Sequence, residues 1–361
     1  MGISDKIAKL EVEISTTKKH KGTEYHIGLI KARLAKYKRE SAATKKAGGG
    51  TGFDVKKSGD STVVLIGLPS TGKSTLLNVL TNAASKAASY AFTTLTCIPG
   101  IMEYNGAKIQ ILDLPGIIGG AKGGKGRGRE VLSVARNADL VLLIVDVFQP
   151  SALELLKEEL HGVGLRLDQS PPQIFMSKSQ TGGISIKSTV KLTKLDDKLI
   201  TGILNEYGIH SAGIVFREDA TEDQLIDFLD GNRRYTPFLT VLNKVDLVSP
   251  DFIKHLKFPF VPVSAEKKEN LENLRARIFQ SLQLIRIYTK PRMDEADMKA
   301  PMMMRANSTV GDACDKLHRD LRKDFKFAQI WGPSAKFPGQ KGGLDHVLLD
   351  GDVITIVKKQ G

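Results

Sequence analysis

Hydrophobic residues follow a helical period near the N-terminus and form short unbroken runs further along the chain. The helical spacing occurs twice, at Ile3, Ile7, Leu10 and Ile14 and then at Ile27, Ile30, Leu34 and Tyr37. Polar residues 15–23 separate the two sets, so a basic helical hairpin is predicted over residues 1–45. Largely apolar runs at 63–66, 140–145 and 238–242 are typical of parallel strands that are buried on both faces.

The segment between Val147 and Phe238 is too long for a single crossover connection. Residues 151–160 predict a crossover helix, and the remainder predicts a small αβ insert. Its expected elements are strands at 184–187, 190–192 and 212–216, a helix at 197–207, and a helix that is capped by Thr221 and Gln224 and closed by Gly231.

A further group of elements follows a helix that is predicted over residues 271–284. Alternation predicts strands at 285–288, 327–331 and 353–357, and an irregular connection spans residues 291–301. Thr309 and Asp312 have the spacing of a capping box and predict a helix between the first two strands. This order predicts a small mixed sheet packed on one helix.

The segment after the first apolar run carries the most specific chemistry. It has the order strand, G-x-x-x-x-G-K-S, helix, which is the context of a phosphate-binding loop. The predicted nucleotide contacts are Gly67, Pro69, Ser70, Thr71, Gly72, Lys73, Ser74 and Thr75. Backbone N–H groups of such a loop face phosphate oxygens, Lys73 is expected to reach the β- and γ-phosphates, and Ser74 is expected to bind Mg²⁺. A chance glycine-rich turn is the alternative, and the flanking strand and helix argue against it.

Three further positions are expected to act around the γ-phosphate. The segment 90–95 contains the threonine of a first switch, for which Thr94 is preferred and Thr93 is the alternative. Asp113 ends the strand predicted at 108–113 and begins a D-x-x-G motif. Its carboxylate is expected to hold Mg²⁺, commonly through water. Gly116 is expected to offer its N–H to the γ-phosphate. Lys73, Thr94 and Gly116 are therefore the predicted catalytic residues, and Ser74, Thr94 and Asp113 the predicted metal ligands.

Ile117 comes directly after Gly116 and changes the expected mechanism. Ras-like enzymes place a glutamine there to orient the attacking water, and isoleucine cannot form hydrogen bonds. The water must then be positioned by backbone, by groups on the Mg²⁺ side, or by another residue or a partner. Residues 119–129 combine glycines with four cations and are predicted to form the second switch, with a solvated loop as the alternative.

The motif Asn243-Lys244-Val245-Asp246 follows another apolar run and predicts the base. The Asp246 carboxylate can accept from both N1–H and the exocyclic amine of guanine, while Asn243 can contact O6 or N7. Adenine presents no such pair of donors, so a mismatch would leave a buried carboxylate unpaired. The stem of Lys244 can cover the ring. Ser264 and Ala265 end a further strand, and the Ala265 N–H can meet O6. The ordered set predicts a GTP-binding domain.

Composition limits the class of protein. The 361 residues are enough for two or three domains, and 41% hydrophobic with 26% charged residues is ordinary for a globular protein. No apolar run has membrane-spanning length, the N-terminus does not resemble a signal peptide, and the only cysteines are Cys97 and Cys314. A cytoplasmic, monomeric protein without membrane association is therefore predicted.

The net charge of +13 favours a polyanionic partner. Residues 1–50 hold 12 Lys and Arg against 5 Asp and Glu. Two interpretations of the N-terminal hairpin stay open at this point: a solvated helical pair docked on the next domain, or an arm that faces RNA. DNA reading by the hairpin is less favoured because no recognition helix with base-reading side chains is evident.

Seven segments carry the pattern of a known family, and they are most specific outside the shared GTP motifs: Thr23–Leu29, Gly48–Val55, Gly67–Ser74, Phe92–Leu95, Asp113–Ile118, Lys125–Arg129 and Gly343–Leu348. On these segments the chain resembles the developmentally regulated GTP-binding proteins, in the Obg-like branch of translation-factor-class GTPases. The resemblance covers nearly the whole length. It implies an α/β fold: a P-loop GTPase core with a parallel-type sheet, an N-terminal helical hairpin, an inserted ribosomal-protein-like αβ domain and a C-terminal TGS domain of β-grasp shape.

The expected boundaries are 1–45 for the hairpin, 46–59 for a glycine-rich linker, 60–165 and 236–286 for the GTPase core, 166–235 for the insert and 287–361 for the TGS domain. The resemblance also implies a cytosolic protein that associates with ribosomes or RNA, binds GTP and GDP with Mg²⁺, and hydrolyses GTP slowly. Ile117 fits a family in which a hydrophobic residue replaces the glutamine. Eukaryotic members pair with a dedicated regulatory protein. Some relatives hold K⁺ with a P-loop asparagine; Ser70 departs from that pattern and leaves K⁺ activation open.

The sequence thus predicts a GTP-hydrolysing switch that acts on ribosomes or RNA in translation. The alternative is a basic ribosome- or RNA-binding module in which GTP is chiefly a regulatory ligand and turnover is negligible. The isoleucine at position 117 and the absence of a visible catalytic base keep this alternative open.

Overall fold

The computed structural model describes residues 2–18, 20, 22–44, 58–81, 98–114, 135–291, 297–318 and 320–359. The chain forms two compact units. One unit combines residues 1–52 with residues 164–235, and the other combines residues 53–163 with residues 236–361. No helix among the described residues is long and apolar enough to cross a membrane.

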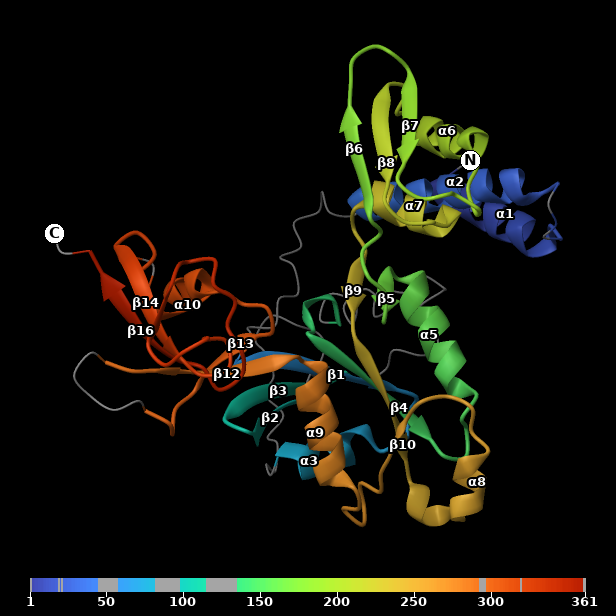
Figure 1. Cartoon of the computed structure of the whole chain (residues 1–361). Helices are drawn as coiled ribbons and strands as arrows, with labels where there is room; N and C mark the ends of the chain where they lie inside the picture. The colour runs from blue at the N-terminus through green and yellow to red at the C-terminus, as the bar shows by residue number, and fades with distance from the viewer. Residues whose placement is uncertain are drawn as a thin grey trace. The chain divides into compact units, whose positions relative to one another are not determined.

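The second unit contains a six-stranded sheet with the strand order β11-β10-β4-β1-β3-β2 (Figure 1). Its strands are β1 Ser61–Gly67, β2 Ile98–Tyr104, β3 Ala107–Asp113, β4 Leu140–Asp146, β10 Phe238–Asn243 and β11 Val261–Pro262. All neighbours pair in parallel except β2, which is antiparallel to β3 at the edge. The three predicted apolar runs are thus confirmed as β1, β4 and β10, neighbouring strands of a parallel sheet.

Three helices pack on this sheet through buried apolar residues: α3 Lys73–Thr81, α5 Ala152–Gly162 and α9 Leu271–Ser281. Helix α8 Pro250–Lys254 and a short 3-10 helix at Val245–Leu247 have no buried residues. Apolar residues of α3 and α9 join one core with alternate residues of the strands, such as Val63 and Leu142. The helix predicted over 271–284 ends earlier, because Gln283 has a left-handed φ of 50° and strand β12 begins at Leu284.

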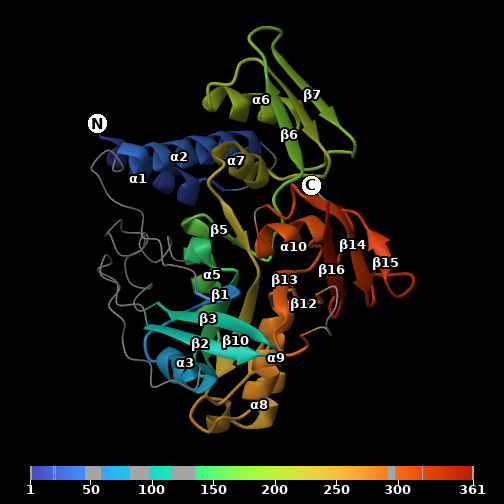
Figure 2. The same cartoon turned by 90° about the vertical axis from the view of Figure 1, so that its left-hand side faces the viewer.

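The C-terminal part of the same unit is a five-stranded mixed sheet with the order β13-β12-β16-β14-β15. Its elements are β12 Leu284–Thr289, β13 Met302–Arg305, α10 Val310–Leu317, β14 Phe325–Trp331, β15 Gln340–Gly342 and β16 Val353–Lys358. The apolar side of α10 packs on one face of the sheet (Figure 2). The capping box is confirmed: Thr309 and Asp312 exchange side-chain to backbone hydrogen bonds at 3.3 and 2.8 Å. Strands β13 and β15 were not predicted, because neither alternates over enough residues.

The first unit is built from two segments that lie far apart in the sequence. Its elements are α1 Ile3–Thr16, α2 Glu24–Thr44, β6 Ile174–Lys178, β7 Ile184–Ser188, α6 Asp197–Glu206, β8 Ala212–Phe216 and α7 Glu222–Asp230. The short strands β5 Leu165–Leu167 and β9 Arg234–Thr236 pair where the chain enters and leaves the insert. The predicted strand at 190–192 is wrong. Strand β7 ends at Ser188, whose hydroxyl bonds to the backbone of Val190 and forms a local turn instead.

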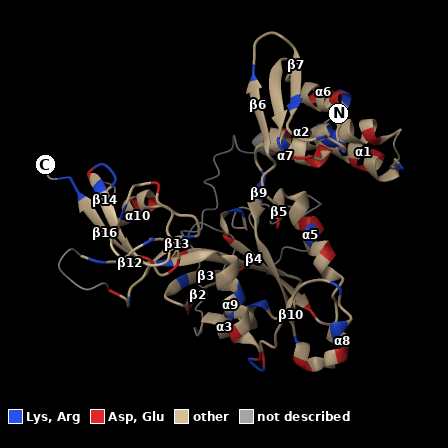
Figure 3. Cartoon of the chain, viewed as in Figure 1, with Lys and Arg blue, Asp and Glu red and all other residues tan. Residues whose placement is uncertain are grey.

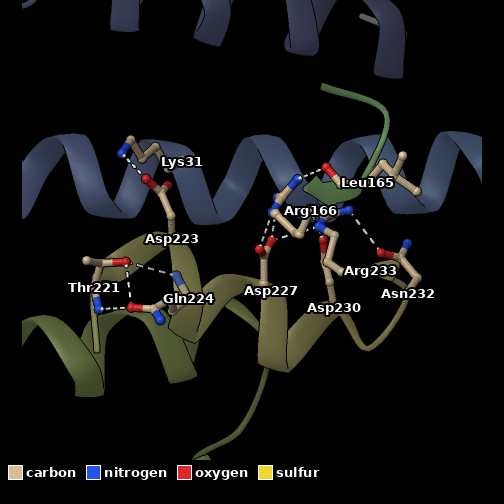
Figure 4. Close-up of polar contacts among 10 residues, drawn as sticks. All are labelled: Lys31, Leu165, Arg166, Thr221, Asp223, Gln224, Asp227, Asp230, Asn232 and Arg233. Atoms are coloured by element: carbon tan, nitrogen blue, oxygen red, sulfur yellow. Dashed lines mark hydrogen bonds and ion pairs between the residues drawn. The ribbon is translucent and has the colours of Figure 1, made fainter. Parts of the chain in front are cut away.

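The N-terminal hairpin packs against the insert through α2. Ile30 and Ala32 of α2 are buried, and Ala32 shares one core with α6, α7 and the insert sheet. Lys31 pairs with Asp223 at 2.9 Å (Figure 4) and with Glu222 at 3.0 Å. Two more cations of α2 contact Glu206 of the insert, namely Arg33 through an ion pair and Lys36 through the backbone carbonyl. Of the two interpretations, docking describes α2, and these three cations are already partnered.

A buried ion cluster holds helix α7 to the two ends of the insert (Figure 4). Asp227 accepts from Arg166 at 2.5 and 2.7 Å and from Arg233 at 2.7 Å. Arg233 also pairs with Asp230, which accepts from the hydroxyl of Tyr207. Burial, together with the Asp230 carboxylate, raises the pKa of Tyr207. The cluster leaves neither carboxylate uncompensated, which is the condition under which buried charges are tolerated.

Candidate nucleotide site

The predicted site residues gather at the carboxyl ends of the parallel strands. The loop between β1 and α3 carries the G-x-x-x-x-G-K-S motif, and Asp113 ends β3. Asn243 ends β10, directly opposite Asp146 at the end of β4. Ligands of open α/β sheets bind at this edge, because loops and helix N-termini converge there.

Glycine is required at both ends of the loop that joins β1 to α3. A Cβ on Gly67 would lie 2.5 Å from the carbonyl oxygen of Ile144. Gly72 has a φ of +86°, and a Cβ there would clash with the side-chain nitrogen of Asn243. Ser70 also has a left-handed φ of 62°. The backbone therefore curls tightly in front of α3, the arrangement that turns successive N–H groups toward an anion.

Lys73 lies inside this loop. Its ammonium donates to the carbonyl oxygens of Gly67 and Leu68 at 3.0 and 2.7 Å, and the Thr71 hydroxyl donates to Leu68 at 2.9 Å. Burial lowers the pKa of Lys73, although the nearby Asp113 carboxylate acts in the opposite direction. A desolvated ammonium that donates to neutral carbonyl oxygens can exchange them for phosphate oxygens, which attract it more strongly.

Ser74 and Asp113 form the oxygen pair that was predicted to bind metal. The Ser74 hydroxyl donates to Oδ2 of Asp113 at 2.6 Å. Asp113 is only 3% exposed, and its Oδ1 is buried without a hydrogen-bond partner in the part of the chain that the structure describes. A buried carboxylate oxygen without a partner is costly. Hydroxyl and carboxylate oxygens are ligands that Mg²⁺ prefers, so these two residues fit a Mg²⁺ site.

Asn243 connects the phosphate side of the site to the base side. Its side-chain nitrogen donates to the carbonyl oxygen of Thr71 at 2.9 Å, and its side-chain oxygen accepts from the Ala265 N–H at 3.1 Å. Asn243, Ser264 and Ala265 are all buried. One amide thus fixes the spacing between the phosphate-binding loop and the loop after β11.

Asp246 remains ionised at neutral pH in this arrangement. A hydrogen bond with Ser264 is the main cause that holds the pKa of Asp246 below its ordinary value. The ammonium of Lys267 lies 3.6 Å from the carboxylate and acts in the same direction. An ionised carboxylate accepts two hydrogen bonds without donating any, which suits a ligand edge with two adjacent N–H donors.

Asp146 is a site residue that the sequence analysis missed. Its Oδ2 lies 2.7 Å from the ammonium of Lys244, a residue with a left-handed φ of 65°. Its Oδ1 accepts from the Phe148 N–H at 3.0 Å. The sequence signal that could have identified Asp146 is a single carboxylate directly after the apolar run 140–145. The pair fixes the direction of the Lys244 stem, which was predicted to cover the base.

The remaining predicted site residues fall into two groups. Pro69, Ser70 and Thr75 are exposed, in the loop and in the first turn of α3. Thr93, Thr94, Gly116, Ile117 and the segment 119–129 lie outside the described residues. The structure therefore brings together the phosphate loop, Asp113 and the base-side residues.

Family models match three consecutive parts of the chain. A model described as 50S ribosome-binding GTPase matches residues 62–178, a model of the C-terminal region of that domain matches 181–284, and a TGS domain model matches 285–358.

Curated relatives match over the full length. An uncharacterised GTP-binding protein of Methanocaldococcus jannaschii is 50% identical over 100% of this chain and 94% of its own. Developmentally-regulated GTP-binding protein 1 of Xenopus laevis and developmentally-regulated GTP-binding protein 2 of Homo sapiens are each 48% identical over 99% of this chain and 100% of their own. With its GTPase and TGS domains, the chain belongs to the family of developmentally regulated GTP-binding proteins and is a GTP-binding GTPase.

Proposed function

We propose that this GTPase is a slow, GTP-hydrolysing switch that acts on ribosomes or RNA in translation. The main support for the proposal is that Asn243 joins the P-loop to the loop after β11 through two hydrogen bonds. The oxygen pair of Ser74 and Asp113 belongs to the same site. The description of the matching family model as a ribosome-binding GTPase, together with the net charge of +13, supports a ribosomal or RNA partner.

Guanine selection would rest on three groups of the base side. Asp246 would accept from N1–H and the exocyclic amine, the Ala265 N–H would donate to O6, and the Lys244 stem would cover the ring. The depressed pKa of Asp246 supports this role, because only the ionised carboxylate accepts from both donors. Adenine would leave that carboxylate facing no pair of donors.

The phosphate side would be held by the loop N–H groups, by Lys73 and by Mg²⁺. Ser74 and Asp113 would hold the ion, with Thr94 as the third predicted ligand. When bound, Mg²⁺ neutralises charge on the phosphate oxygens. Lys73 would supply a fixed cation beside the transferred group, and the Gly116 N–H would report the presence of the γ-phosphate.

Slow turnover follows from Ile117, which can neither donate nor accept a hydrogen bond to the attacking water. The protein would then depend on backbone groups or on a partner to orient that water. This dependence gives the switch a reason to respond to a ribosome, because ordering of the water is the missing step.

The test is multiple-turnover release of phosphate by the purified protein, with and without ribosomes, in K⁺ and in Na⁺. Stimulation by ribosomes is expected, and Lys73→Ala should return the rate to background. Stimulation by K⁺ alone would assign the missing group to a bound cation, despite Ser70. Rates equal to those of the Lys73→Ala control under every condition would overturn the enzymatic role. The protein would then be a basic binding module for which GTP is a regulatory ligand.

A further inference from the structure

The sheet of the insert has one covered face and one open face. Its strand order is β6-β8-β7, and Ala212, Ile214 and Phe216 of β8 point into the core with α6 and α7. The alternate residues Gly213 and Val215 are half-buried on the opposite side. Side chains of the two outer strands that share this side are exposed, so no described residue of the unit covers it.

The open face consists of two rows that run across the three strands. The first row is Phe175, Val215 and Lys187, which are direct cross-strand partners. The second row is Ser177, Gly213 and Ser185, paired in the same way. Residues two apart on a strand are about 7 Å apart, so the rows form a small platform. One row offers an aromatic ring and a cation, and the other offers two hydroxyls on either side of bare backbone.

Phe175 is the exposed aromatic of this platform. Its side chain is 52% exposed, although large apolar groups are normally buried. The guanidinium of Arg217, two residues beyond Val215, lies 4.6 Å from the ring centroid. The contact orients the ring at the edge of the sheet. Gly213, at the centre of the second row, has no side chain, and a Cβ there would lie 3.3 Å from the hydroxyl oxygen of Ser177. The second row therefore projects less from the sheet than the ring of Phe175.

The segment that carries the outer strands and the helix on the covered side differ in charge. Residues 169–195, which include β6 and β7, contain four lysines and no acidic residue or arginine, and one of these lysines, Lys187, lies in the first row of the open face. Helix α7, on the covered side, contains four acidic residues and no Lys or Arg. Figure 3 shows blue but no red on β6 and β7, and red on α7. The acidic residues of α7 pair with Lys31, Arg166 and Arg233, so they do not neutralise the open face.

We propose that this open face binds single-stranded RNA. An unpaired base would stack on Phe175, Lys187 and Arg217 would contact phosphates, and the hydroxyls of Ser177 and Ser185 would meet ribose 2′-OH groups. A single exposed ring beside cations selects unpaired bases, because the bases of a duplex already stack on each other. The inference rests on the proposed action on ribosomes or RNA and names the surface that makes the contact.

The test uses the full chain and a fluorescein-labelled single-stranded RNA of about ten nucleotides, a length within the usual range for a small β platform. Phe175→Ala should weaken binding by about fivefold to about a hundredfold, the effect of one lost base stack. Phe175→Trp should restore it. Phe252→Ala, on helix α8 and 45% exposed, is the matched control and should leave the affinity unchanged.

The phosphate contact is tested by the dependence of affinity on salt. Lys187→Gln should lower the slope of log affinity against log salt by about 0.7, the value for one phosphate contact with a single strand. Lys326→Gln, at another exposed lysine, on β14, should leave the slope unchanged. Unchanged binding by Phe175→Ala would overturn the proposal. So would equal competition by duplex RNA or by polyglutamate, because neither offers an unpaired base.

These results are separable from the test of the proposed function. The Phe175 variants should retain the basal rate of GTP hydrolysis, since all the predicted nucleotide contacts lie in other segments of the chain. A protein that binds single-stranded RNA through Phe175 but fails to hydrolyse GTP would keep this inference and refute the switch. A protein that hydrolyses GTP on ribosomes but binds single-stranded RNA without dependence on Phe175 would keep the switch and refute this inference.

Discussion

The GTPase sheet and the insert sheet use different parts of their strands. In the GTPase core the polar groups follow buried runs at the ends of parallel strands, as Asp113, Asp146 and Asn243 do. In the insert the proposed contacts lie across the middle of three strands, on a face that the helices leave open. A site at strand ends is assembled by loops and needs a buried sheet. A site on a sheet face needs one side of the sheet to stay uncovered.

The first prediction would break the strand-end site at its base side. Asp246→Ala should weaken GTP and GDP binding by about 10²- to 10⁴-fold, because two hydrogen bonds to an ionised group are lost at about 1.5 to 3 kcal/mol each. Titration with a fluorescent guanine nucleotide measures the loss, and the preference for GTP over ATP should shrink in parallel.

The control for this variant is Asp251→Ala, which removes an equally charged residue from an exposed ion pair with Lys254 on α8. It should leave nucleotide affinity within about twofold, as exposed pairs contribute little. A loss of ATP and GTP affinity by the same factor would place Asp246 outside base recognition.

The strand-end site of the GTPase core and the proposed sheet-face site of the insert also differ in how far the sequence predicts them. The strand-end motifs are contiguous, so Gly67–Ser74 and Asn243–Asp246 were recognised without knowledge of the fold. The hydrogen bond from Asn243 to Thr71 spans 172 positions and depends on how β1 and β10 are placed in the sheet. Asp146 was missed because a single carboxylate after an apolar run has no motif.

The insert was predicted less completely, for reasons that are also physical. Helix α7 was found because Thr221, Gln224 and Gly231 give local start and stop signals. Strand β6 was missed because Ile174, Phe175 and Met176 are all apolar and hide the alternation. The open face became visible only when register aligned Phe175 with Val215 and Lys187.

The second prediction would break the insert without touching the strand-end site. Asp227→Ala removes the carboxylate that buried Arg166 shares with Arg233, although Arg233 keeps its pair with Asp230. It should lower the free energy of unfolding of this unit by about 3 to 5 kcal/mol. Denaturant unfolding, monitored through the hydrogen exchange of α7 amides, measures the change in the free energy of unfolding. GTP affinity should remain within about twofold under conditions where the variant is folded, since the nucleotide site belongs to the other compact unit and shares no partner with Asp227 among the described residues.

Glu11→Ala provides the comparison within the same unit, because Glu11 pairs with Lys38 and both side chains are exposed. Its effect should stay below about 1 kcal/mol. Equal destabilisation by the two variants would mean that the buried cluster adds nothing beyond a surface ion pair.

The third prediction sharpens the account of the base side. Asp146→Asn weakens the ion pair that orients Lys244 and should reduce guanine-nucleotide affinity by about fivefold, which corresponds to about 1 kcal/mol for a partly exposed pair. The same fluorescent-nucleotide titration measures it. Glu154→Gln, in the exposed pair with Lys157 on α5, serves as the control. An unchanged affinity for Asp146→Asn would show that the Lys244 stem needs no such support.

The fourth prediction compares two helices that begin with the same motif. Helix α7 opens with Thr221 and Gln224, and α10 opens with Thr309 and Asp312. Only the second motif contains a titratable partner, and hydrogen bonds from Thr309 hold the pKa of Asp312 below its ordinary value. Each Thr→Ala variant should cost about 1 kcal/mol at neutral pH, seen as about fivefold faster hydrogen exchange of the helix.

The stability losses caused by Thr309→Ala and by Thr221→Ala should differ at acidic pH. A carboxyl with a depressed folded-state pKa contributes stability above its unfolded-state pKa and loses it as pH falls through the folded-state value. Protonated Asp312 is a weaker acceptor, so the cost of Thr309→Ala should shrink below about pH 4, after correction for intrinsic exchange rates. The cost of Thr221→Ala should not change through its partner, because Gln224 does not titrate. Equal pH dependence in both helices would assign the effect to the general charge of the protein and not to the Asp312 cap.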